Sequence, residues 1–172
     1  MKRQRLRNDN TIVMFEHGAF DHAFGCLYQE GMALIEETAA YIDGNGKIAS
    51  RALSGEASAL YASEAMRMST RLMQVASWLL LFRAAREDEM TPEQIRQEKA
   101  KVSLNTPCLS KDHINWQELP IDFRRLVDLS IRLEERVRHM DQDVENALAE
   151  NGICHNPVSE RINLLKAAFQ DD

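Results

Sequence analysis

The sequence predicts an all-α protein: an antiparallel three-helix bundle with a short extra helix before the third helix and a mobile C-terminal tail. The 172 residues include only 7 Gly and 4 Pro, whereas residues that favour helices are abundant. Three long segments repeat apolar residues at alternating steps of three and four, which places them along one face of a helix. No segment shows the alternation that is typical of a strand.

The first helix is expected from about Phe20 to Tyr41, after a basic flexible leader over residues 1–16. Its seam is the row of residues that should face a partner helix: Phe20, Phe24, Leu27, Gly31, Leu34, Thr38 and Tyr41. Gly25 and Gly31 each cost about 1 kcal/mol relative to Ala inside a helix. Close approach of a neighbouring backbone is the expected compensation.

The second helix is expected to end near Asp88 and to begin at Ile48 or, after a break that Ser54 caps, at Gly55. Its seam comprises Tyr61, Ala65, Met68, Leu72, Val75, Leu79 and Phe82. A second apolar column lies beside this seam and comprises Met66, Met73 and Leu80. Together they make the apolar surface wider than a single seam needs. We therefore expect a homodimer in which this column is partly buried.

A short helix is expected after Thr91, because Thr91 can cap it, Pro92 suits the first helical position and Gln94 completes a capping box. A long connection over residues 102–119 should follow. Connections of this length are uncommon unless they are functional or flexible.

The third helix is expected from Pro120 to about Glu150, with Gly152 as its stop. Its seam comprises Phe123, Leu126, Ser130, Leu133, Val137, Met140, Val144 and Ala147. The bundle domain should thus span residues 17–152, followed by a tail over residues 153–172. Short turns favour antiparallel neighbours, so the long helices are expected in up-down-up order.

Composition excludes several classes of protein. The formal net charge of −6 argues against nucleic-acid binding over the whole surface. No apolar run approaches the roughly 20 residues that span a bilayer. Cys26, Cys108 and Cys154 are odd in number and far apart, which fits a reducing, cytoplasmic compartment.

No constellation of residues indicates catalysis or a bound cofactor. His17, His22 and Cys26 are the best metal-ligand candidates, but the remaining ligands would have to come from separate segments. Glu135 and His139 are spaced one residue too far apart for a di-iron motif. Nucleophile elbows and phosphate-binding loops are absent from the sequence. We predict a protein that is not an enzyme and binds no metal or cofactor.

Arginine outnumbers lysine, and many arginines lie on the second and third helices. Solvated ion pairs explain most of them, but arginine is also enriched where proteins dock. Arg67 and Arg71 are therefore candidate docking residues. The tail adds an apolar cluster suited to docking: Ile162, Leu164, Leu165 and Phe169. The alternative is a DNA-associated regulator that uses the basic leader and the helix arginines.

A resemblance to a known family rests on Ser69–Leu80, with Leu27–Leu34 and Ser63–Arg67 upstream. These segments resemble the alphaproteobacterial regulator of CtrA degradation (RcdA-like) family, much of which is catalogued as a domain of unknown function. The resemblance covers about residues 20–150. It implies a dimeric, non-enzymatic adaptor that helps to deliver cell-cycle regulators to the ClpXP protease, together with other adaptors. It also implies a cytoplasmic protein that can associate with the cell pole. No binding residue is carried over.

Overall fold

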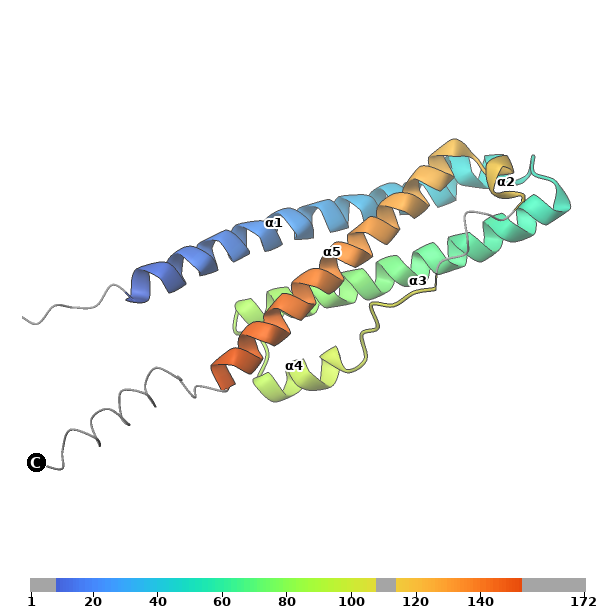
Figure 1. Ribbon diagram of the computed structural model, residues 1–172. Coiled ribbons are helices and arrows are strands. Elements are labelled where there is room, and N and C mark those ends of the chain that lie inside the picture. The colour runs from blue at the N-terminus through green and yellow to red at the C-terminus, as the bar shows by residue number, and fades with distance from the viewer. Residues whose placement is uncertain (1–8, 108–113, 153–172) are drawn as a thin grey trace, which may run out of the picture. The chain divides into compact units, whose positions relative to one another are not determined.

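The computed structural model describes residues 9–107 and 114–152, and these are largely helical, with no strand among them. The elements, in chain order, are α1 (Asp9–Tyr41), η1 (Ile42–Gly46), α2 (Lys47–Ser50), α3 (Gly55–Arg86), α4 (Pro92–Lys99), η2 (Trp116–Glu118) and α5 (Ile121–Gly152) (Figure 1). The chain divides into two compact units, Met1–Val137 and Arg138–Asp172. The first unit holds α1, α3 and the first half of α5, which together form the predicted three-helix bundle.

Capping residues fix the helix starts that the sequence predicts. The Ser54 hydroxyl accepts a hydrogen bond from the Ala57 N–H at 3.3 Å, so α3 begins at Gly55 after a break. The Thr91 hydroxyl accepts from the Gln94 N–H at 3.3 Å, and the Gln94 side chain accepts from the Thr91 N–H at 2.9 Å. Both predicted caps are confirmed. They satisfy backbone donors that the first turn of a helix leaves unpaired.

The first helix begins earlier than expected. Residues 9–16 already belong to α1, whereas the sequence suggested a start near Phe20. The division into leader, bundle domain and tail stays a prediction.

The predicted seams form the core of the first unit. Phe24 and Leu27 of α1, Met68 and Val75 of α3, and Leu126 of α5 are buried. Aromatic rings pack together at both ends of this core. The ring centroids of Phe20 and Phe82 are 5.8 Å apart at one end, and those of Tyr61 and Phe123 are 4.2 Å apart at the other. Periodic apolar side chains thus determine which face of each helix is buried.

The two glycines of α1 differ in their surroundings. A Cβ atom at Gly31 would lie 2.7 Å from a methyl group of Leu79, so a side chain, not a backbone, passes close to this glycine. No described atom lies within 4 Å of a Cβ position at Gly25. The expected close backbone approach is therefore wrong at both positions.

The direction of α5 differs from the expected up-down-up order. α1 is antiparallel to α3, because Phe20 meets Phe82 at one end and Gly46 lies against Tyr61 at the other. α5 is parallel to α3, because Tyr61 meets Phe123 whereas Arg71, further along α3, meets Ser130.

The connection between α3 and α5 explains this parallel direction. Its last described residues, 114–119, lie beside the start of α3 (Figure 1). There the Ser54 hydroxyl donates to Glu118 at 3.0 Å, and the Asn115 amide donates to Glu56 at 3.0 Å. The expected up-down-up order assumed short turns between the long helices, whereas the long connection after α4 returns the chain to the start of α3.

Candidate functional site: the open face of α1 and α3

The face between α1 and α5 is bridged by ion pairs. Arg136 donates to Glu30 at 2.6 Å, and Arg125 donates to Glu37. The participating side chains are about half exposed, so each pair adds little to stability. These arginines are nevertheless engaged by carboxylates of their own chain.

The face between α3 and α5 contains a buried polar network. Arg71 is fully buried, with its Nε 3.4 Å from Oε2 of Glu134 and its Nη1 donating to the Ser130 hydroxyl at 2.9 Å. The other oxygen of Glu134 accepts a hydrogen bond from the Thr106 N–H at 3.0 Å. The connection that follows α4 therefore crosses this face.

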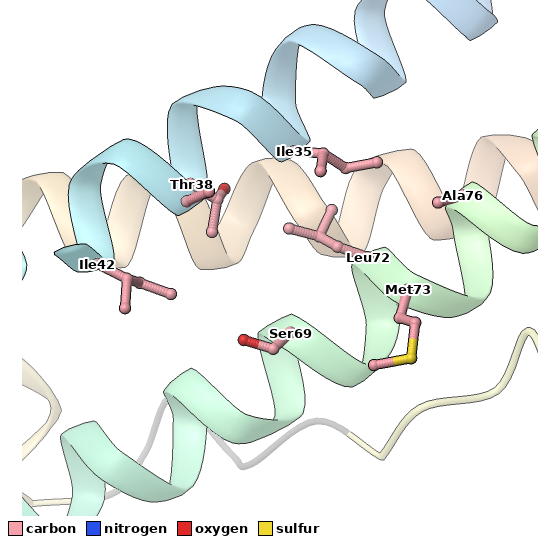
Figure 2. A pocket seen from close by; sticks show the side chains of 8 residues that line it. Ile35, Thr38, Ile42, Ser69, Leu72, Met73 and Ala76 are labelled. Atoms are coloured by element: carbon pink, nitrogen blue, oxygen red, sulfur yellow. The ribbon is translucent and has the colours of Figure 1, made fainter.

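The face between α1 and α3 is hollowed and apolar. The hollow has a volume of about 330 Å³ and is lined by Ile35, Thr38, Ala39, Ile42, Ser69, Leu72, Met73 and Ala76. The four lining residues from Ile35 to Ile42 and the four from α3 are each spaced by three, one and three positions. Each side of the hollow is therefore one stripe of helical surface. Figure 2 shows Leu72 reaching from α3 toward α1. Small side chains such as Ala39 and Ala76 leave the space between the helices unfilled.

Three large apolar side chains are exposed on α3, and one of them, Met73, lines the hollow. Met66 is 72% exposed, Met73 64% and Leu80 50%. They form the column that the sequence placed beside the seam of the second helix. Because Met73 belongs both to this column and to the lining of the hollow, the two together form the best candidate site for an apolar partner surface. We call the column and the hollow together the open face.

The lining of the hollow consists of apolar side chains and two hydroxyls, those of Thr38 and Ser69. Of the described residues that line the hollow, none carries an ionisable side chain. The Thr38 hydroxyl is buried there without a hydrogen-bond partner among the described residues. An apolar surface with a few hydroxyls favours another apolar surface as its ligand.

Comparison with known proteins adds an evolutionary relationship to this geometry. Residues 15–169 match the family described as "Protein of unknown function (DUF1465)". The chain belongs to this family. It is also similar to RcdA from Caulobacter crescentus, whose crystal structure shares 45% sequence identity and superposes with a TM-score of 0.56. The match covers 70% of this chain and 88% of RcdA. The expected RcdA-like family is thus confirmed, and no curated protein matches the chain.

The two arginines that the sequence singled out for docking lie in different environments. The Arg67 side chain is 36% exposed, 3.7 Å from the carboxylate of Glu64. Arg71 is buried in the polar network described above, so it is not available to a partner. The prediction that Arg71 docks a partner is therefore wrong. Arg71 connects α3 to α5 instead. The signal was Ser130, a polar residue inside an otherwise apolar seam, which indicates a polar partner across the core.

Several expected site residues lie outside the described residues. These are the tail residues Ile162, Leu164, Leu165 and Phe169. Sequence reasoning also missed half of the hollow, because Ile35, Ala39 and Ile42 lie beside the seam of α1 rather than on it.

Two of the metal-ligand candidates, His22 and Cys26, lie side by side. Sγ of Cys26 lies 3.8 Å from Nε2 of His22 on the exposed side of α1. Within the described part of the chain, no group of three or more His, Cys, Asp or Glu residues is placed to hold a metal ion. None of its helices is long and apolar enough to cross a membrane.

Two tyrosines, the buried Tyr61 and the half-buried Tyr41, lie near the end of the bundle where α1 ends. Burial raises the pKa of Tyr61, and burial, followed by the proximity of Tyr61 and Asp122, raises the pKa of Tyr41. Neither phenol hydroxyl has a hydrogen-bond partner among the described residues. Their rings pack on Phe123, which indicates a structural role.

Proposed function

We propose that this protein is a non-enzymatic adaptor that helps to deliver cell-cycle regulators to the ClpXP protease. Its similarity to RcdA supports a regulatory role. Within this chain, the observation that carries the proposal is the open face, which offers apolar contact area without ionisable groups. Such a surface suits protein docking better than chemistry on a small molecule. The proposed partners are ClpXP, co-adaptors and cargo regulators, in the cytoplasm and at the cell pole.

A homodimer is part of this proposal. The column Met66, Met73 and Leu80 is proposed to lie in the contact between two copies. Burying a methionine or leucine side chain contributes about 1.5–3 kcal/mol. Exposed to water, the same side chains make no such contribution, so the column favours association.

The tail is proposed to contribute a second docking element through Ile162, Leu164, Leu165 and Phe169. A segment that orders on binding can form weak, reversible contacts. Deletion of residues 154–172 should then leave helicity and thermal stability almost unchanged and should slow cargo turnover by ClpXP. If the truncated chain melts many degrees lower, the tail belongs to the core and this part of the proposal fails.

The alternative function is a DNA-associated regulator. The engagement of Arg125, Arg136 and Arg86 by carboxylates of their own chain favours the adaptor, because phosphate binding requires positive charge that is free to act. A salt titration of DNA binding separates the two. A regulator gives a binding constant that falls steeply with salt, whereas the adaptor shows no DNA affinity at physiological salt.

Reconstituted proteolysis tests the proposal. Purified ClpXP, a cell-cycle regulator as cargo and its co-adaptors are mixed with and without the protein. We expect faster cargo loss in its presence and no loss when ClpX is omitted. Equal cargo half-lives with and without the protein would contradict the adaptor function.

A further inference from the structure

Residues 102–107, which we call the strap, cross the face between α3 and α5. Val102, Leu104 and Thr106 are half-buried, whereas Ser103, Asn105 and Pro107 are exposed. This alternation is that of an extended chain, in which successive side chains point to opposite sides. The strap thus lies on the bundle as an extended peptide would lie on a receptor.

The strap is anchored through its backbone rather than through its side chains. The Ser103 N–H donates to Oε1 of Gln74 on α3 at 2.9 Å, and the Thr106 N–H donates to Oε1 of Glu134 on α5 at 3.0 Å. N–H groups an odd number of residues apart point to opposite edges of an extended chain. One edge of the strap therefore faces α3 and the other faces α5. Any extended peptide can offer the same donors.

The acceptor on α5 is held in place independently of the strap. One oxygen of Glu134 lies 3.4 Å from Nε of the fully buried Arg71, and Arg71 also donates to the Ser130 hydroxyl. The other oxygen accepts from the strap. The Arg71 guanidinium attracts this carboxylate through charge rather than through a hydrogen bond. Because Arg71 stays buried beside Glu134 when the strap leaves, the acceptor is kept near its place, and preorganisation of this kind favours binding.

We propose that Gln74 and Glu134 form a binding site for an extended segment of a partner protein, which this chain fills with its own strap. The partner segment carries apolar side chains two residues apart, as Val102 and Leu104 do, and displaces the strap to bind. Because the strap is intramolecular, its effective concentration is high, so the partner also needs a second contact. The site lies on α3 and α5 and does not depend on the open face, so the two proposals can fail separately.

A peptide added in trans tests this site. The probe is a synthetic peptide with the sequence of residues 101–107, titrated to millimolar concentration into the full isotope-labelled chain and followed by NMR. The Leu104→Asp variant should release the strap by placing a charge at a half-buried position. Asn105→Asp introduces the same charge at the neighbouring exposed position and is the matched control.

We expect the peptide to shift signals of Gln74 and Glu134 in the Leu104→Asp variant, with at least tenfold tighter binding than in the intact chain or the Asn105→Asp variant. Adding Gln74→Ala should then weaken peptide binding by roughly two- to tenfold, the range for loss of one hydrogen bond. Equal peptide affinity in all three chains, or shifts away from α3 and α5, would overturn the proposal.

Hydrogen exchange on the intact chain gives an independent answer if the Leu104→Asp variant does not fold. The Ser103 and Thr106 amides should exchange through local opening, at least tenfold faster than the core amides of α3. If these two amides exchange only at the rate of global unfolding, the strap does not leave its site and the proposal is wrong.

Discussion

Substitution of Met73 by glutamate tests the open face directly. Met73 is 64% exposed, so in the isolated chain the new carboxylate stays in water. Substitutions at such positions change the free energy of unfolding by no more than about 0.5 kcal/mol. We therefore expect Met73→Glu to leave the thermal melt close to that of the intact protein.

Association should respond much more strongly than folding. Full burial of a methionine contributes about 1.5–3 kcal/mol, and Met73 is 64% exposed, so its loss removes about 1–2 kcal/mol. This corresponds to roughly a 5- to 25-fold increase in Kd at about 1.4 kcal/mol per tenfold. Burial of an unpaired carboxylate adds to this loss. The assay is sedimentation equilibrium over a range that reaches tens of micromolar. Ile121→Glu is the matched control, because Ile121 is 74% exposed and does not line the hollow.

Two results would refute this reasoning. If the intact protein sediments as a monomer throughout the range, the open face does not join two copies. If Met73→Glu and Ile121→Glu weaken association equally, the contact involves charge or another surface rather than the apolar column.

Three further predictions concern the fold. Gly25→Ala should raise stability by up to about 1 kcal/mol through helix propensity, whereas Gly46→Ala should lower it, because its Cβ would lie 2.6 Å from the Tyr61 hydroxyl oxygen; urea unfolding measures both. Arg71→Ala should lower stability by about 3–5 kcal/mol, because Glu134 is left buried without its partner; a double-mutant cycle with Glu134→Gln gives the coupling between them. Folding raises the pKa of Tyr61, so the folded state holds the phenol proton more tightly than the unfolded state. The stability that this difference contributes is constant below about pH 10 and is lost as the pH rises further. Tyr61→Phe should therefore lose less stability than the intact chain in alkaline melts.

Local chemistry made the helices predictable. The seams follow from the helical period, and the starts of α3 and α4 follow from the side chains of Ser54 and Thr91, which act on backbone groups three residues away. Nothing in these local signals encodes the direction of α5. That direction depends on the path of the connection after α4, which ends beside the start of α3 through contacts such as Ser54 with Glu118.

The candidate site was predictable in part for the same reason. The exposed column on α3 follows from its spacing beside the seam. The α1 side of the hollow was missed, because a residue flanking a seam can face either neighbouring helix, and only the packing shows that Ile35 faces α3. Arg71 was misjudged because arginine is rarely fully buried, and its burial depends on Ser130 and Glu134 from a distant segment.

The most direct test of the adaptor account compares cargo turnover by ClpXP in the presence of the intact protein, Met73→Glu or Ile121→Glu, each at the same concentration. The account predicts that the intact protein and Ile121→Glu speed cargo loss equally. Met73→Glu should stimulate cargo loss at least tenfold less, although its thermal melt is unchanged. Full stimulation by Met73→Glu, or none by the intact protein, would contradict the claim that cargo delivery by this chain depends on the open face of α1 and α3.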